Sequence, residues 1–183
     1  MLEITPKSSI KIDGTDITTL PRQLVRSRLN AIPQEPYFIR GRVRSNADPD
    51  HLHTDAAIIA AIQKVQLWEL TLSKGGLDTE LDSDFFSHGQ CQLFCLVRAI
   101  LRESKVVILD EVTCSVDSKS DDLMQRMVGQ EFADCTIIAI AHRLDTILDF
   151  DRIALLSKGE LIEFDTPEAQ LGGPGAFREL YNS

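Results

Sequence analysis

The chain has 183 residues, of which 43% are hydrophobic, and this is enough for one domain with a hydrophobic core. The formal net charge of −9 argues against nucleic acid as the main partner, because contacts to a phosphate backbone require a basic face. No apolar run approaches the roughly 20 residues that cross a membrane, and the first residues, MLEITPKSSI, lack the basic and apolar regions of a signal peptide. The charge still permits a phosphate ligand held by backbone N–H groups and a metal ion.

The first predicted elements are short. SSIKIDG predicts a strand that Gly14 closes, LPRQLVRS predicts a helix with Pro21 in its first turn, and RLNAI predicts a second strand. The two prolines of PQEPYF exclude regular structure directly after that strand.

Two helices are predicted in the middle of the chain. Residues 54–72 have apolar residues at helical spacing, with Thr54 as the N-cap. After a loop, SKGGLDTELDSD, residues 87–102 predict a second helix. Its start carries Ser87 and, three residues later, Gln90, which is the pattern of a capping box.

The second half of the chain alternates strands and helices. The predicted elements are a strand over 105–110, a helix over 118–132, a strand over 136–141, two strands around the Lys-Gly turn of RIALLSKGELIEF, and short C-terminal helices. Residues 106–109 and 136–141 are apolar without alternation, which is typical of strands covered on both faces in a parallel sheet. Strand, helix and strand in series indicate a βαβ unit.

The cysteines are Cys91, Cys95, Cys114 and Cys135, and no two form a C-x-x-C pair. Cys91 and Cys95 share one helix face, but a zinc site would need further ligands that the neighbouring sequence does not offer. Reduced thiols in a cytosolic domain are the simpler interpretation.

Polar side chains follow three of the predicted strands. Asp110 and Glu111 end one strand, His142 follows another, and Gln34 follows a third. Ligands of open parallel sheets bind at the carboxyl ends of the strands, so one carboxylate could hold Mg²⁺ and the next could polarise an attacking water. The alternative is a charge pair at the start of a helix.

The stretch FSHGQ offers a second candidate site. A helix N-terminus with free N–H groups beside the Ser87 hydroxyl is suited to an anion, and Gly89 lets another backbone approach closely. The alternative is an ordinary capped core helix.

Five motifs occur in this order along the chain: IPQEPYF, FSHGQ, VVILDE, SVD and AHRL. From about residue 8 to the end, they resemble the Q-loop, signature, Walker B strand, D-loop and switch-histidine region of the nucleotide-binding domain of ABC transporters. LFCLVRAIL and SKGELIEFDTP are most similar to the second such domain of the C-type, multidrug-resistance-associated branch. The resemblance implies an α/β fold, with a P-loop NTPase-like parallel sheet core and an inserted helical signature lobe at about residues 50–102.

The resemblance also implies catalytic roles and the cofactors ATP and Mg²⁺. Asp110 would hold Mg²⁺, and Glu111 would be the general base for the attacking water. His142 would contact the terminal phosphate. Gln34 would sense Mg²⁺ and the coupling helices of an exporter's transmembrane domains.

The implied partner is a second nucleotide-binding domain, because the family shares its ATP sites across a head-to-tail dimer. Ser87, Gly89 and Gln90 would close over ATP bound by that partner, and Asp117 would line the dimer interface. The implied location is the cytosolic face of a membrane, as part of a transporter.

The phosphate-binding motif G-x-x-x-x-G-K-[ST] does not occur in the sequence. The resemblance therefore predicts an N-terminally truncated domain over residues 1–183, whose phosphate loop would lie before Met1. A truncated gene model, a deliberate fragment and a decayed copy are alternatives that the sequence does not separate. Phe86 replaces the usual leucine of the signature, and Cys91 replaces a basic residue, which removes a positive charge near the bound phosphate.

Three functions compete. The first is the ATPase of an exporter, inactive without its phosphate-loop half. The second is a non-hydrolysing binding module that docks onto another nucleotide-binding domain and completes its site. The third is a chromosome-maintenance ATPase, which would carry long coiled coils that this sequence lacks.

Overall fold

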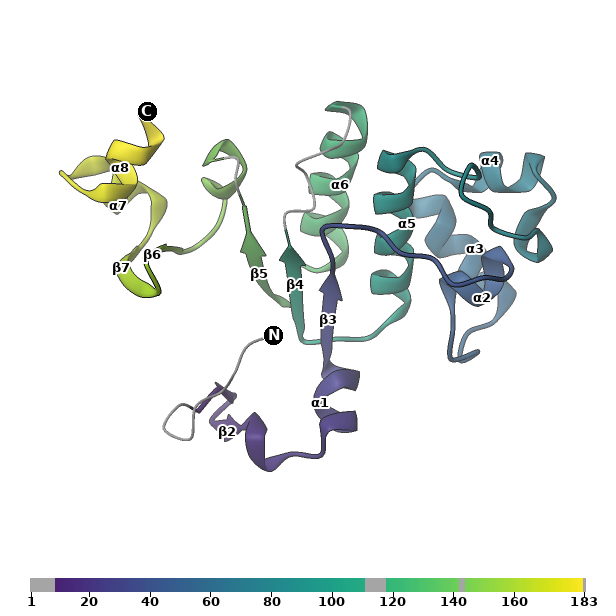
Figure 1. The fold of residues 1–183 in the computed structure, drawn as a ribbon, viewed down its shortest axis with the longest axis horizontal. Coiled ribbons are helices and arrows are strands. Elements are labelled where there is room, and N and C mark those ends of the chain that lie inside the picture. Colours follow the sequence, from purple (N-terminus) through teal and green to yellow (C-terminus); the bar gives the residue numbers. More distant parts are fainter. Residues whose placement is uncertain (1–8, 111–117, 142–143, 183) are drawn as a thin grey trace. The chain divides into compact units, whose positions relative to one another are not determined.

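The computed structural model describes residues 9–110, 118–141 and 144–182 (Figure 1). The chain divides into two compact units, Met1–Ile138 and Ala139–Ser183. The elements, in chain order, are β1 (Lys11–Ile12), β2 (Thr15–Asp16), the 3-10 helix η1 (Ile17–Thr19), α1 (Arg22–Arg28), β3 (Leu29–Ile32), α2 (Val43–Ala47), α3 (Asp55–Lys64), α4 (Trp68–Ser73), the 3-10 helix η2 (Gly76–Asp78), α5 (His88–Leu101), β4 (Val106–Asp110), α6 (Ser118–Glu131), β5 (Thr136–Ile140), the 3-10 helix η3 (Leu144–Ile147), β6 (Ile153–Ser157), β7 (Glu160–Asp165), α7 (Pro167–Gly172) and α8 (Ala176–Tyr181).

The central element of the first unit is a parallel sheet. β3 pairs with β4 in parallel, from Leu29 opposite Val106 to Ile32 opposite Leu109, and the strand order is β3-β4-β5. Figure 1 shows the three arrows pointing the same way. Ile32 and Val107 are fully buried. The predicted mixed α/β fold with a parallel sheet is confirmed.

The prediction that residues 136–141 are covered on both faces is wrong. β5 lies at the edge of the sheet order, and its side chains alternate between exposed and half-buried. Ile138 is 51% exposed and Ile140 is 52% exposed. An apolar run indicates a strand suited to burial, but whether it is buried depends on the elements that lie next to it.

The predicted single helix over 54–72 is two helices, α3 and α4. The Thr54 side chain accepts a hydrogen bond from the Ala57 N–H, so the predicted N-cap is confirmed. The chain then turns at Gln66, whose φ of 59° lies in the left-handed region. This turn buries both Val65 and Leu67, and packing therefore overrides the helical pattern.

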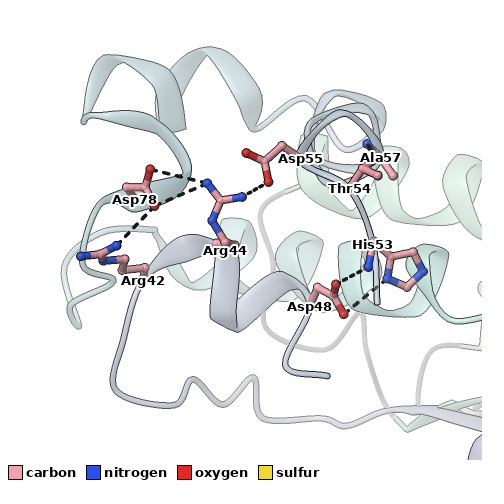
Figure 2. Close-up of polar contacts among 8 residues, drawn as sticks. All are labelled: Arg42, Arg44, Asp48, His53, Thr54, Asp55, Ala57 and Asp78. Carbon is pink, nitrogen blue, oxygen red and sulfur yellow. Dashed lines mark hydrogen bonds and ion pairs between the residues drawn. The ribbon is translucent and has the colours of Figure 1, made fainter. Parts of the chain in front are cut away.

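Exposed ion pairs connect α2 with the elements around it (Figure 2). Arg44 pairs with Asp55 of α3 and with Asp78 of η2, and Arg42 lies 3.5 Å from Asp78. Such exposed pairs contribute little stability. The sequence pattern does not predict α2.

The helix α5 is the core helix of the first unit. Ser87 Oγ accepts from the Gln90 N–H and Gln90 Oε1 accepts from the Ser87 N–H, which confirms the capping box. Its side chains at Phe94, Leu96 and Val97 are fully buried. The helix packs against α2, α3, α6 and β3.

The second unit contains the predicted hairpin and short helices. β6 and β7 pair in antiparallel fashion around Lys158 and Gly159, whose φ values of 50° and 84° are those of a tight hairpin turn. Gln170 of α7 donates to the Ile153 carbonyl at 2.7 Å. Glu163 of β7 accepts hydrogen bonds from the first N–H groups of α8. In the described ranges of both units, no helix is long and apolar enough to cross a membrane.

Candidate functional site

The carboxyl ends of β3 and β4 bring two of the predicted site residues to one edge of the sheet. Ile32 is opposite Leu109, so the same register continued by one residue places Asp110 beside Pro33, next to Gln34. Both Asp110 and Gln34 are exposed. Parallel pairing explains this arrangement, because it aligns the ends of strands that are far apart in sequence.

These two residues fit part of a Mg²⁺ site. A carboxylate and an amide offer the oxygen ligands that Mg²⁺ prefers, and Mg²⁺ usually keeps several waters and shares its remaining positions with phosphate oxygens. The described residues contain no cluster of three or more potential His, Cys, Asp or Glu ligands.

Three predicted site residues lie outside the described residues: Glu111, Asp117 and His142. Their roles as general base, interface residue and phosphate contact stay predictions.

The start of α5 presents the second candidate site. Ser87 is exposed, Gly89 is buried and Gln90 is half-buried. Ser87 Oγ accepts the capping hydrogen bond from the Gln90 N–H, and the Ser87 hydroxyl can still donate its own proton. Gln90 also lines a cleft of about 390 Å³, which continues along Leu93 to Lys119 and Arg126 of α6. The hydroxyl and the helix N-terminus are suited to an anion.

The structure also shows polar contacts that the sequence interpretation missed. Gln92 of α5 donates from Nε2 to the Gln34 carbonyl at 3.2 Å. Arg98, six residues further along the same helix, donates to the carbonyls of Tyr37 and Asn46. The available signal was chemical: Gln92 and Arg98 are polar residues on a helix whose neighbouring positions are apolar.

Comparison with known proteins identifies the family. Residues 2–114 match the family model described as ABC transporter. The chain is 47% identical to ABC multidrug transporter B of Aspergillus fumigatus, a match that covers 100% of this chain and 13% of that protein. It is 46% identical to ABC transporter ecdL of Aspergillus rugulosus, over 100% of this chain and 12% of the relative. It is 41% identical to ATP-binding cassette sub-family C member 10 of Mus musculus, over 95% of this chain and 12% of the relative.

The parallel sheet, the motifs at its carboxyl edge and these matches define the class: the chain belongs to the ABC transporter family. It spans about an eighth of the length of the curated relatives that it matches.

Proposed function

We propose that this chain is part of the ATP-binding and ATP-hydrolysing domain of an ABC-type exporter, in the second nucleotide-binding domain of a C-type transporter. The observation that carries the proposal is the parallel pairing of β3 with β4, since it brings Gln34 and Asp110 to one edge of the sheet. A relative named as a sub-family C member supports the C-type assignment.

The proposed chemistry divides between the strand ends. Asp110 and Gln34 would hold Mg²⁺, directly or through waters. Glu111 accepts the proton of the attacking water, and His142 contacts the terminal phosphate. Bound Mg²⁺ supplies positive charge that offsets the negative charge of the phosphates.

The proposed partners are a second nucleotide-binding domain and the transmembrane domains of the exporter. Ser87, Gly89 and Gln90 close over ATP held by the partner domain, and Asp117 lies at their interface. A cleft of about 530 Å³ beside Tyr37 and Leu52 offers the transmembrane side a place to dock. Tyr37 is 63% exposed and lies three positions after Gln34 in the sequence.

The chain by itself is expected to bind nucleotide weakly. Its sequence contains no G-x-x-x-x-G-K-[ST] motif, and this motif normally surrounds the β-phosphate with backbone N–H groups and a lysine. Without it, too little positive charge offsets the repulsion between the triphosphate and the carboxylates of Asp110 and Glu111. We expect an affinity for Mg-ATP no better than about millimolar, roughly −4 kcal/mol, and no hydrolysis above background.

Calorimetric titration of the chain with Mg-ATP tests this proposal. Supplying a segment that carries the phosphate-binding motif should restore binding. Glu111→Gln should then abolish turnover while nucleotide stays bound, because the amide cannot accept the proton of the attacking water. Micromolar affinity of the chain alone would contradict the expected weak binding, and unchanged turnover in the Glu111→Gln variant would contradict the assigned base.

The second candidate is a binding module that completes the ATP site of another domain without hydrolysing ATP itself. The exposed, capped start of α5 favours it, because Ser87 and its hydroxyl are available without any phosphate loop in the chain. The two candidates predict different results when the chain is supplied with a segment that carries the phosphate-binding motif. Glu111→Gln then abolishes turnover only if this chain carries the catalytic base.

A further inference from the structure

The segment that carries Gln34 is held against α5 at several points. This segment, residues 33–41, connects β3 with α2 and is called the strap below. Gln92 donates to the Gln34 carbonyl at 3.2 Å, and Arg98 Nη1 donates to the Tyr37 carbonyl at 2.7 Å. The ring of Phe94, which lies between Gln92 and Arg98 on α5, is 5.5 Å from the ring of Phe38 in the strap. The strap is therefore fixed to one helix at both polar and apolar points.

The far end of the strap is held by a buried amide. Asn46 of α2 is fully buried, and its side chain bonds both the N–H and the carbonyl of Ile39, at 2.9 and 3.0 Å. Arg98 Nη2 donates to the same Asn46 side chain at 3.1 Å, and Arg98 Nε donates to the Asn46 carbonyl at 2.6 Å. A single guanidinium on α5 thus connects the strap with α2.

The surroundings of Arg98 explain why an arginine is needed there. Its guanidinium lies 5.2 Å from the centre of the Tyr37 ring and 5.1 Å from that of the Phe38 ring. Burial lowers the pKa of Arg98 from its ordinary value. Among the described residues it makes no ion pair with a carboxylate. Its planar fork bonds carbonyl and amide oxygens in fixed directions, and the ammonium of a lysine cannot reproduce these directions.

Gln92 is the α5 residue that bonds Gln34, near the start of the strap. It is 2% exposed, and its Oε1 has no hydrogen-bond partner among the described residues. Burying an unpaired oxygen lowers stability. A buried glutamine at this position is therefore explained only if the NH₂ group of its side chain makes a useful bond. That NH₂ group holds the Gln34 carbonyl.

We propose that Gln92 and Arg98 are positioning residues that fix the backbone of Gln34 to α5, the helix whose N-cap is the exposed Ser87. The importance of Gln34 in this inference rests on the proposed function. The physical consequence is that Gln34 and the start of α5 move together, so a displacement of one displaces the other. Neither positioning residue has to touch nucleotide for this coupling.

Hydrogen–deuterium exchange of the full chain, without nucleotide, tests the proposal. Arg98→Met keeps the apolar stem and removes the fork, and Gln92→Leu removes one bond together with the unpaired oxygen. Each variant should loosen the strap and so speed exchange of its amides by roughly three- to tenfold, above all that of Ile39, whose N–H bonds Asn46 Oδ1, while α3 keeps its protection. Arg102→Met is the matched control, because Arg102 is exposed just after the end of α5.

Two further results test the proposed roles of Arg98 and Gln92. Arg98→Lys should behave like Arg98→Met, and wild-type protection in the lysine variant would contradict the role of the fork. Unchanged strap exchange in Gln92→Leu, or equal acceleration in the strap and α3, would overturn the proposal, since the latter reports only general destabilisation. Because no nucleotide is present, the outcome does not depend on whether the chain acts on ATP.

Discussion

Asn46 and Arg98 meet across 52 positions of the chain, where Arg98 binds both the main-chain and the side-chain oxygen of Asn46. The Asn46 side chain also donates to the carbonyls of Ile39 and Arg42, so its amide bonds groups from the segment before α2 and from α5. Helix α2 is only five residues long, and a helix of this length is not stable by itself. Its place therefore depends on this amide and on the buried side chains beside it.

Replacing this amide should cost much of the chain's stability. Asn46→Ala leaves the Ile39 N–H and the carbonyls of Ile39 and Arg42 without their partners in a partly buried place. We expect the free energy of unfolding to fall by roughly 2–4 kcal/mol. Urea denaturation followed by circular dichroism measures this change. Asn182→Ala, at an exposed position, is the control and should change the midpoint little.

Two substitutions at Ser87 separate its capping role from its proposed contact with ATP. Ser87→Ala removes the cap and should lower the free energy of unfolding by about 1 kcal/mol. Ser87→Asp keeps an acceptor for the Gln90 N–H and should leave stability close to wild type, but it places a negative charge where a phosphate is proposed to bind.

Thermal melts and binding to a nucleotide-loaded partner domain measure the two roles. In the assembled protein, Ser87→Asp should weaken nucleotide-dependent association more than Ser87→Ala does. Equal association of the Ser87→Asp variant and the wild type would show that Ser87 is only a helix cap.

The buried thiols should react slowly. Burial raises the pKa of the Cys95 thiol above its ordinary value and does the same for the half-buried Cys91. At about pH 8, alkylation by iodoacetamide should be much slower at Cys95 than in the unfolded chain, because the thiolate is the reacting form. Mass spectrometry of the alkylated peptides gives the rates, and equal rates in folded and unfolded chain would contradict the burial of Cys95.

The same pKa shift affects stability at high pH. Above the pKa of the unfolded thiol, the unfolded chain has lost a proton that the folded chain still binds. The free energy of unfolding should therefore fall as pH rises through the unfolded pKa, and it should be unaffected by this group below that value. Cys95→Ala should flatten this part of the pH dependence, which denaturation at several pH values would reveal.

Exposed apolar strands should make the chain prone to association. Ile138 and Ile140 of β5 are exposed, as are Leu156 of β6 and Phe164 of β7. Apolar strand surfaces of this kind promote edge pairing and aggregation. The chain should bind a hydrophobic dye, and the Leu156→Lys and Phe164→Lys double variant should bind less.

Size-exclusion chromatography and dye fluorescence test this expectation. Leu180→Lys changes another exposed apolar residue, outside the strands, and serves as the control. A monodisperse wild-type chain with a sharp melt at high temperature and no dye binding would contradict the expectation.

Local chemistry made several elements predictable from the sequence. The caps at Thr54 and Ser87 and the turn at Lys158 and Gly159 depend on residues within a few positions of one another. The strand that ends at Asp110 and its parallel sheet followed from an uninterrupted apolar run. The family resemblance followed from the motifs and was confirmed by the family model and the relatives. The roles of Glu111, Asp117 and His142 remain predictions.

Contacts between distant residues decided the rest. The turn at Gln66 divides a helical pattern because it buries Val65 and Leu67 against other elements. The bonds from Gln92 to Gln34 and from Arg98 to Asn46 join residues 58 and 52 positions apart, which no local pattern encodes. The sequence alone determined which side chains end the strands, because periodicity and capping act locally. Only the tertiary structure decided what holds Gln34 in place, because that depends on which helix packs beside the strap.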